Sequence, residues 1–219
     1  MPRVGDPIEL ERPASWVALV GFMGTGKSRI GSELARALAL HFVDTDKLIE
    51  KSTGLSIPQI FEAFGEQEFR RVEAEAILRC TRLDEFVISC GGGTFMSEPN
   101  RNLLLERGPV IALHASPETI FERTKRSSRP LLQVPDPIGR IRELLDARRA
   151  FYNLAPIQVS TDGRQRRDVV AEIIERLEVW REDQDQMMDS EPRDSSGQDS
   201  GRQDSDRQDS DRQDSGENA

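Results

Sequence analysis

The sequence predicts an α/β fold in which a five-stranded parallel sheet is flanked by helices on both faces. Short β-like apolar runs alternate with helical patterns from about residue 15 to residue 180, and this alternation is typical of parallel strands joined by crossover helices. A glycine-rich stretch joins the first apolar run to the first helical pattern. The chain has 219 residues, enough for one ordinary domain with appendages.

The individual elements follow from the apolar pattern and from the punctuating residues. The strand candidates lie at 16–20, 41–43, 86–90, 109–113 and 157–159. Apolar residues after position 28 recur with helical spacing, which predicts a helix directly behind the glycine-rich stretch. The Ser-Ile-Pro-Gln segment at 56–59 predicts another helix start, because it combines an N-cap serine, a first-turn proline and a capping-box glutamine. Gly65 interrupts that helix, and a further helical run begins at Glu66.

The glycine-rich stretch has the pattern of a phosphate-binding loop. Residues 21–28 read Gly-Phe-Met-Gly-Thr-Gly-Lys-Ser and match the pattern G-x-x-x-x-G-K-[ST] between a strand and a helix. Backbone N–H groups of such a loop and the helix N-terminus bind phosphate oxygens, the lysine contacts the β- and γ-phosphates, and the hydroxyl ligates Mg²⁺. The alternative is an ordinary strand-to-helix turn. The nucleotide-binding residues predicted here are Gly24, Thr25, Gly26, Lys27 and Ser28.

Charge and composition exclude several classes of protein. The net charge is −9, but residues 181–219 carry 13 Asp and Glu against 5 Arg, so the remainder is nearly neutral. That remainder has no basic stripe of the kind that binds nucleic acid, and no apolar run is long enough to span a membrane. The two cysteines, Cys80 and Cys90, are too few for a disulfide framework, so we expect reduced thiols.

The C-terminal part of the chain is a repeat rather than a domain. The motif Gln-Asp-Ser recurs every five residues between 198 and 215, preceded by Arg in its last three copies and without an apolar residue, so it cannot offset the entropy of ordering. We therefore expect a flexible segment at 1–14, a folded domain at 15–180 and a disordered acidic tail at 181–219. A docking or phosphorylation segment is the alternative for the tail.

Two acids follow the second predicted strand, at the sheet edge where α/β folds bind ligands. Alternation along the strand turns Asp44 and Asp46 the same way, toward the crevice. One could then hold a Mg²⁺-bound water while the other orients or deprotonates an acceptor hydroxyl. Either could instead cap the next helix.

Further candidates lie later in the chain. Arg70 and Glu73 share a helix face, although a solvated face is the commoner outcome for such charges. Three glycines follow the third strand and would let a ligand approach the backbone closely, or would form a mobile loop. A basic, serine-containing segment ending at Arg129 has the composition of a lid that stabilises phosphate charge.

Together these motifs resemble the shikimate kinase family over roughly residues 15–175. The resemblance rests on the phosphate loop, Asp-Thr-Asp at 44–46, Gly-Glu-Gln-Glu-Phe-Arg at 65–70, Gly-Gly-Gly at 91–93 and Arg-Pro-Leu-Leu at 129–132. It implies a phosphate-loop fold of the nucleoside-monophosphate-kinase type, with strand order 2-3-1-4-5 and a lid. It also implies phosphorylation of the 3-hydroxyl of shikimate by ATP, with Mg²⁺, by a cytoplasmic monomer.

The same resemblance implies roles for individual residues. The catalytic residues are Asp46, Lys27 and Arg129. The ATP contacts outside the loop are Arg129 and Arg164. The shikimate contacts are Asp46, Arg70, Gly91, Gly92, Gly93 and Arg148. The Mg²⁺ contacts are Ser28 and, through water, Asp44. Two alternatives remain open, a gluconate-type carbohydrate kinase and a nucleotide-binding regulatory protein that uses the tail as an interaction module.

Overall fold

The computed structural model describes residues 14–125 and 132–190. Five parallel strands form one sheet in the order β2-β3-β1-β4-β5. Their bounds are β1 Trp16–Gly21, β2 His41–Asp44, β3 Phe86–Ser89, β4 Val110–His114 and β5 Ile157–Ser160. The predicted sheet and its strand order are confirmed, and each predicted run coincides with one strand.

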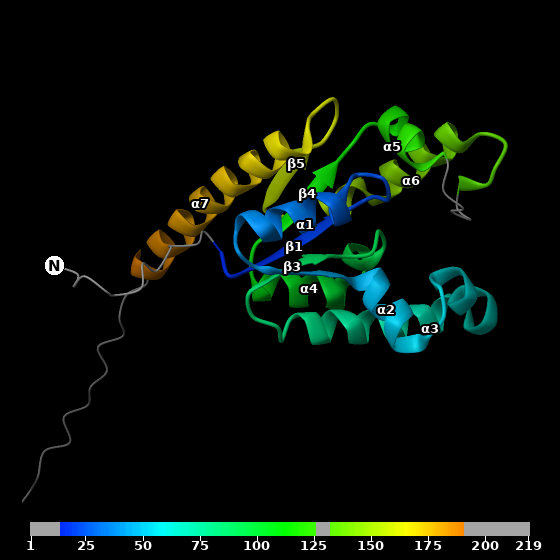
Figure 1. The fold of residues 1–219 in the computed structure, drawn as a ribbon, viewed down its shortest axis with the longest axis horizontal. Coiled ribbons are helices and arrows are strands. Elements are labelled where there is room, and N and C mark those ends of the chain that lie inside the picture. Colours follow the sequence, from blue (N-terminus) through cyan, green and yellow to red (C-terminus); the bar gives the residue numbers. More distant parts are fainter. Residues whose placement is uncertain (1–13, 126–131, 191–219) are drawn as a thin grey trace, which may run out of the picture.

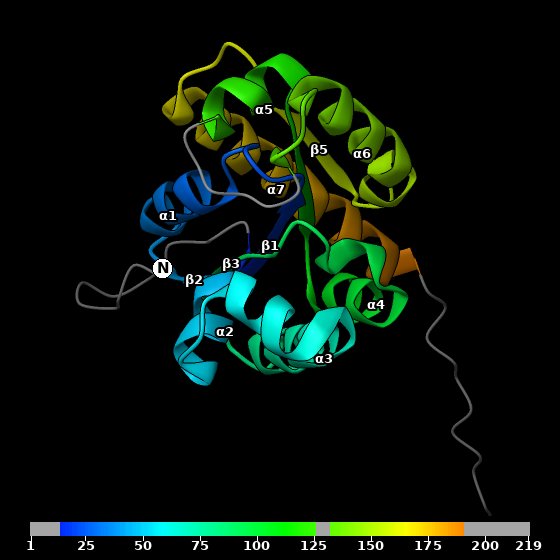
Figure 2. The ribbon, with the colours of Figure 1, turned by 90° about the vertical axis from the view of Figure 1, so that its right-hand side faces the viewer.

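Helices cover both faces of the sheet (Figures 1 and 2). One face carries α1 (Lys27–Ala37) and α7 (Arg166–Ser190), and the other carries α3 (Ile57–Cys80), α4 (Glu98–Arg107) and α6 (Pro137–Tyr152). Three shorter elements follow strands directly or after a brief loop: α2 (Thr45–Thr53) after β2, the 3₁₀ turn η1 (Thr94–Met96) after β3, and α5 (Pro117–Thr124) after β4. The carboxyl ends of the strands therefore lead into elements that can carry a site.

The central strand β1 anchors the phosphate loop. All six of its residues are buried. Trp16, Ala18 and Val20 pack with residues of α3, α4 and α6, whereas Val17 and Leu19 pack with α1 and α7. Burying each large apolar side chain stabilises the fold by about 1.5–3 kcal/mol. The loop that begins at Gly21 therefore leaves a strand that is fixed from both faces.

Helix α3 is bent, as the glycine at its ninth position predicts. Gly65 has φ 78° and ψ 178°, a backbone conformation that only glycine adopts readily. The backbone N–H of Ser56 donates to Oε1 of Gln59 at 2.9 Å, which confirms the predicted start. A separate cluster of Ile49, Ile60, Phe69 and Ala76 joins α2 to α3 beside the sheet. The bend thus lets one helix serve both this small cluster and the main core.

One predicted boundary is wrong. Helix α7 runs to Ser190, so residues 181–190, which the composition assigned to the acidic tail, are helical. The helix is anchored by residues such as Ile173 and Leu177, which are fully buried. Beyond them Trp180 still packs against the core, and the Arg, Glu and Gln residues that follow have good helix propensity and continue the helix. Residues 1–13, most of the predicted lid (126–131) and residues 191–219 lie outside the described residues.

Candidate active site

The phosphate loop turns tightly between β1 and α1. Gly24 and Gly26 have φ values of 82° and 100°, and Gly26 caps the N-terminus of α1. A Cβ added to Gly24 would lie 2.9 Å from Cγ2 of Thr124, so a side chain there would also clash with α5. The glycines at these two positions therefore have a local steric reason, and the loop presents the positive end of the α1 dipole to the pocket.

Lys27 reaches back along its own loop. Its Nζ donates to the carbonyl oxygens of Gly21 at 2.7 Å and Phe22 at 3.0 Å. The side chain is 9% exposed. Thr25 adds a hydrogen bond from its hydroxyl to the same Phe22 carbonyl at 2.8 Å. The ammonium group is thus fixed in the concave side of the loop, where phosphate oxygens of a nucleotide would lie.

Ser28 and Asp44 meet as expected for a metal-binding pair. Oγ of Ser28 donates to Oδ2 of Asp44 at 2.5 Å. Asp44 also caps α2, because its other carboxylate oxygen accepts from the N–H of Lys47 at 3.3 Å. The two interpretations of this acid, as cap and as site residue, are therefore compatible. Among the described residues, no group of three or more His, Cys, Asp or Glu side chains is placed to hold a metal.

Strand alternation is the wrong reason for the expected position of Asp46. Strand β2 ends at Asp44, and Asp46 lies in the first turn of α2. The helix turn nevertheless places it in the predicted pocket, against the third strand's glycines. A Cβ added to Gly91 would lie 2.7 Å from Oδ1 of Asp46. Helical geometry, rather than strand alternation, brings the two acids to the same pocket.

These groups line one pocket of about 350 Å³ at the carboxyl edge of the sheet. All five predicted nucleotide-binding residues of the loop line it, and its lining includes Met23, Gly24, Thr25, Gly26, Lys27, Ser28, Asp44, Asp46, Cys90, Gly92, Arg123, Thr161 and Arg164. Lysine and arginine side chains face two carboxylates across it. The pocket can therefore receive a polyanion bridged by a cation.

Arg123 contributes to this pocket in a way that the sequence analysis missed. The basic segment before Arg129 suggested a lid, but Arg123 belongs to α5. Its guanidinium donates to Oγ1 and the carbonyl oxygen of Thr161, both at 2.9 Å, and to the carbonyl of Gly24 at 3.2 Å. It thus ties the phosphate loop to the segment after β5. The only sequence signal for Arg123 was its position in the basic segment that ends at Arg129, and that segment predicted a lid rather than a contact with the phosphate loop.

Arg164 lies at the rim of the same pocket. Its guanidinium is hydrogen-bonded to the carboxylate of Glu172 and to the carbonyls of Ser160 at 3.2 Å and Asp168 at 3.1 Å. The structure therefore places this residue, a predicted ATP contact, at the edge of the pocket in an ion pair with α7. Arg129, the predicted lid arginine, lies outside the described residues.

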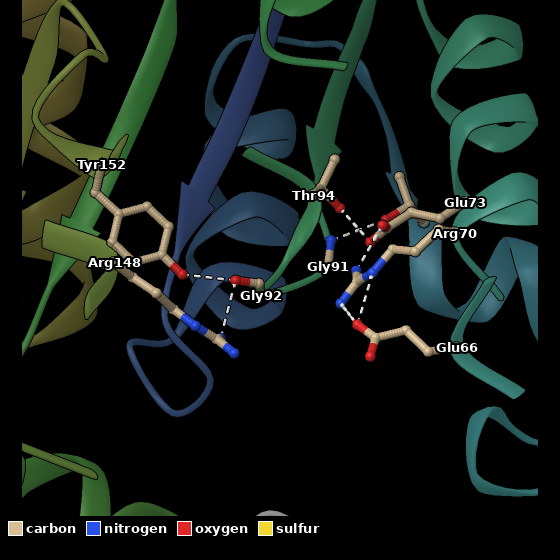
Figure 3. A network of polar contacts seen from close by, with 9 residues as sticks. Glu66, Arg70, Glu73, Gly91, Gly92, Thr94, Arg148 and Tyr152 are labelled. Atoms are coloured by element: carbon tan, nitrogen blue, oxygen red, sulfur yellow. Dashed lines mark hydrogen bonds and ion pairs between the residues drawn. The ribbon is translucent and has the colours of Figure 1, made fainter. Parts of the chain in front are cut away.

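On the other side of Asp46, α3 presents an arginine between two acids (Figure 3). Nη1 of Arg70 donates to Glu73 at 2.8 Å, and Nη2 donates to Glu66 at 3.1 Å. Glu73 is 1% exposed and also accepts from Oγ1 of Thr94 at 2.8 Å. Burial lowers the pKa of Arg70, but hydrogen bonds and Coulomb attraction from Glu73 and Glu66 outweigh it, so the net pKa is raised. Arg70 is therefore held against the buried Glu73 instead of lying on a fully solvated helix face.

The glycine loop, residues 91–93, runs between this arginine and Arg148 (Figure 3). A Cβ added to Gly93 would lie 2.7 Å from Nη1 of Arg70. On the other side, Nη1 of Arg148 donates to the Gly92 carbonyl at 3.4 Å, and its guanidinium lies 5.3 Å from the centre of the Phe22 ring. The loop is thus ordered, and its small residues let both predicted arginines approach one backbone segment.

Phe61 and Phe69 pack beside Arg70, with ring centroids 4.5 Å apart. Phe69 is 5% exposed, whereas Phe61 is 38% exposed. The Arg70 guanidinium lies 5.2 Å from the centre of the Phe69 ring. An apolar surface therefore stands next to Arg70.

The fold, the phosphate loop and the acids that face it define a phosphate-loop kinase. The model of the shikimate kinase family matches residues 23–178. Shikimate kinases of Deinococcus radiodurans and Thermus thermophilus are 59% and 57% identical, each over 80% of this chain and over 89% and 95% of their own length. The chain therefore belongs to the shikimate kinase family.

Solved structures agree with this assignment. A shikimate kinase from Acinetobacter baumannii, in complex with shikimate, is 37% identical and superposes with a TM-score of 0.72 over 75% of this chain and 93% of that one. A gluconokinase from Sinorhizobium meliloti, 19% identical with a TM-score of 0.55, shares the fold alone. No helix within residues 14–125 and 132–190 is long and apolar enough to cross a membrane.

Proposed function

We propose that this protein transfers the γ-phosphoryl group of ATP to the 3-hydroxyl of shikimate, giving shikimate 3-phosphate and ADP. The observation that carries the proposal is the position of Asp46 between two different sets of groups. On one side lies the nucleotide half of the site, formed by residues 21–28 with Asp44 and Arg123. On the other lies the acceptor half, formed by Arg70, Glu73, the glycine loop and Arg148.

The acceptor half suits a small ring that bears a carboxylate and hydroxyl groups. Arg70 and Arg148 approach the glycine loop from opposite sides, and forked guanidinium donors match carboxylate geometry. Shikimate has one carboxylate, and two arginines are enough to orient it. Asp46, at the junction of the halves, then orients the acceptor hydroxyl and accepts its proton.

The nucleotide half suits ATP with Mg²⁺. Ser28 and Asp44 offer hard oxygen ligands. Mg²⁺ commonly binds only a few protein ligands and keeps several of its waters. Bound there, Mg²⁺ would neutralise charge on the β- and γ-phosphates.

Lys27 supplies a fixed positive charge beside the transferring phosphoryl group. Holding both substrates in line lowers the entropic barrier to their reaction. We assign Arg164 to the adenine side and, from its sequence motif alone, Arg129 to the phosphates.

Measuring ADP release with shikimate, with gluconate and without an acceptor tests this function. We expect rapid release with shikimate that depends on Mg²⁺, and only background release in the other two reactions. Rapid release with gluconate would favour the carbohydrate kinase of similar fold. No acceptor-dependent release at all would favour a nucleotide-binding regulatory protein and would overturn the proposal.

A further inference from the structure

The glycine loop contacts almost every group of the acceptor half. Gly91 packs against Asp46 and Glu73, because an added Cβ would lie 2.7 Å from Oδ1 of Asp46 and 3.1 Å from Oε1 of Glu73. Gly93 packs in the same way against the guanidinium of Arg70. The carbonyl of Gly92 accepts from Arg148. A small displacement of this loop would therefore move the reacting carboxylate and both arginines relative to one another.

Two side chains hold this loop without belonging to the groups that face the acceptor. Thr45 is fully buried, and its Oγ1 accepts from the N–H of Gly91 at 3.0 Å. Tyr152 is 3% exposed, and its hydroxyl donates to the Gly92 carbonyl at 2.6 Å. The two residues come from α2 and from the end of α6, so they clamp the loop from two separate elements.

Each contact lies beside one end of the acceptor half. Thr45 precedes Asp46 in the chain, and both contact Gly91, one through its N–H and the other on its α-carbon. Tyr152 lies one helical turn after Arg148, and both donate to the same Gly92 carbonyl (Figure 3). Thr45 therefore supports the end of the acceptor half that carries Asp46, and Tyr152 supports the end that carries Arg148.

We infer that Thr45 and Tyr152 are positioning residues, which set the geometry of the acceptor half by fixing the glycine loop through Gly91 and Gly92. The inference rests on the proposed function, because it concerns how shikimate is oriented. Tyr152 supplies a second donor to the Gly92 carbonyl, so Arg148 can turn to the substrate carboxylate without releasing the loop. Thr45 keeps Gly91 in place under Asp46.

The two residues are separable by kinetics. Tyr152→Phe removes one hydroxyl, leaves Arg148 as the remaining donor to Gly92, and should raise the KM for shikimate about three- to tenfold with a smaller change in kcat. Thr45→Val keeps the shape but leaves the buried Gly91 N–H without its acceptor, and should lower kcat about ten- to a hundredfold. Thr45→Ser, which retains the hydroxyl, should recover most of that loss. The KM for ATP should stay unchanged in all three variants.

Thr53→Val is the matched control for Thr45→Val. Thr53 lies in the same helix, and its hydroxyl donates to the carbonyl of Ile49 at 2.9 Å, away from the glycine loop. Thr53→Val replaces a hydroxyl by a methyl group, as Thr45→Val does, and should leave kcat and the KM for shikimate at their wild-type values. Melting temperatures of all variants separate a loss of stability from a loss of positioning.

The Tyr152 effect should also depend on Arg148. In an Arg148→Lys background, Tyr152→Phe should change the shikimate KM by more than it does in the wild type, because the Gly92 carbonyl then loses both of its donors. Melting temperatures that fall while both kinetic constants stay at wild-type values would overturn the inference, since the two residues would then be purely structural. A wild-type protein that does not phosphorylate shikimate would instead overturn the proposed function.

Discussion

In the nucleotide half, the proposed ligand-binding groups come mostly from one continuous stretch of backbone, whereas in the acceptor half they come from four separate segments of the chain. Residues 21–28 form their loop between a fully buried strand and a helix that begins at Lys27. Asp46, Arg70, the glycine loop and Arg148 are brought together from α2, α3, the loop after β3, and α6. The first half can therefore form from local geometry, and the second exists only once the sheet has assembled.

This difference has a consequence for substitution. Backbone N–H groups of a phosphate loop survive most side-chain changes, so few single side chains decide nucleotide binding. In the acceptor half, Arg70 balances the charge of the buried Glu73. Removing Arg70 therefore leaves its partner buried without compensation, which affects both ligand binding and stability.

The largest expected effect is in the nucleotide half. Lys27→Met should lower kcat by about 10²–10³-fold, because it removes a fixed positive charge beside the transferring phosphoryl group. Lys47→Met, in an exposed side chain of α2, is the control and should leave kcat unchanged. Calorimetry should show that shikimate binding is retained in the Lys27 variant. Loss of shikimate affinity there would mean that the two halves are not separable.

Asp46→Asn tests the junction of the halves. The substitution preserves the size of the side chain and removes its basicity, so kcat at saturating shikimate should fall by about 10²-fold while the fold is retained. Affinities for ATP and for shikimate, measured by calorimetry, should change much less than kcat. A turnover near that of the wild type would remove Asp46 from proton transfer.

Arg70→Ala should weaken shikimate about ten- to a hundredfold and leave ATP affinity nearly unchanged, because it removes a charge-assisted hydrogen bond to the carboxylate. Arg71→Ala is its control, since the Arg71 side chain is 57% exposed and pairs with Glu68 and Glu75. Equal weakening of shikimate and ATP by the Arg70 variant would contradict a dedicated carboxylate contact.

The same position can separate binding from stability. Arg70→Ala should also lower the melting temperature, because Glu73 stays buried without its cation. Adding Glu73→Gln should recover the melting temperature but not shikimate binding. Recovery of both would indicate that Arg70 serves the fold alone.

The smallest effect concerns the support of the acceptor half. Burial raises the pKa of Tyr152 to about 12, against about 10 for an exposed phenol. Because the folded-state pKa is raised, the stabilising contribution of the neutral phenol is complete below about pH 10 and is lost as the pH rises toward 12. The difference in free energy of unfolding between wild type and Tyr152→Phe should therefore be constant from pH 8 to 9.5 and shrink above pH 10. A difference that shrinks already below pH 9 would contradict the buried hydrogen bond to Gly92.

Many elements of the fold could be predicted from the sequence because their signals are local. The start and bend of α3, for example, followed from a capping box and from Gly65. Strand order is not a local property, and its prediction came from the family resemblance. The end of the domain was misplaced because composition does not report where a helix loses its tertiary anchor. Residues 181–190 have the polar composition of the tail but continue α7.

The chain by itself determined the phosphate loop, because a strand, three glycines, a lysine and a serine in one stretch specify its geometry through backbone sterics and the helix dipole. It also determined which later residues bear charge. Only the tertiary structure decided how those charges are used: Asp46 reaches the site from a helix turn, Arg123 binds the phosphate loop instead of forming a lid, and Thr45 and Tyr152 support the glycine loop. The physical reason is distance along the chain. Contacts between residues 46 or 60 positions apart, such as Thr45 with Gly91 and Tyr152 with Gly92, depend on the packing of whole elements, which no local pattern encodes.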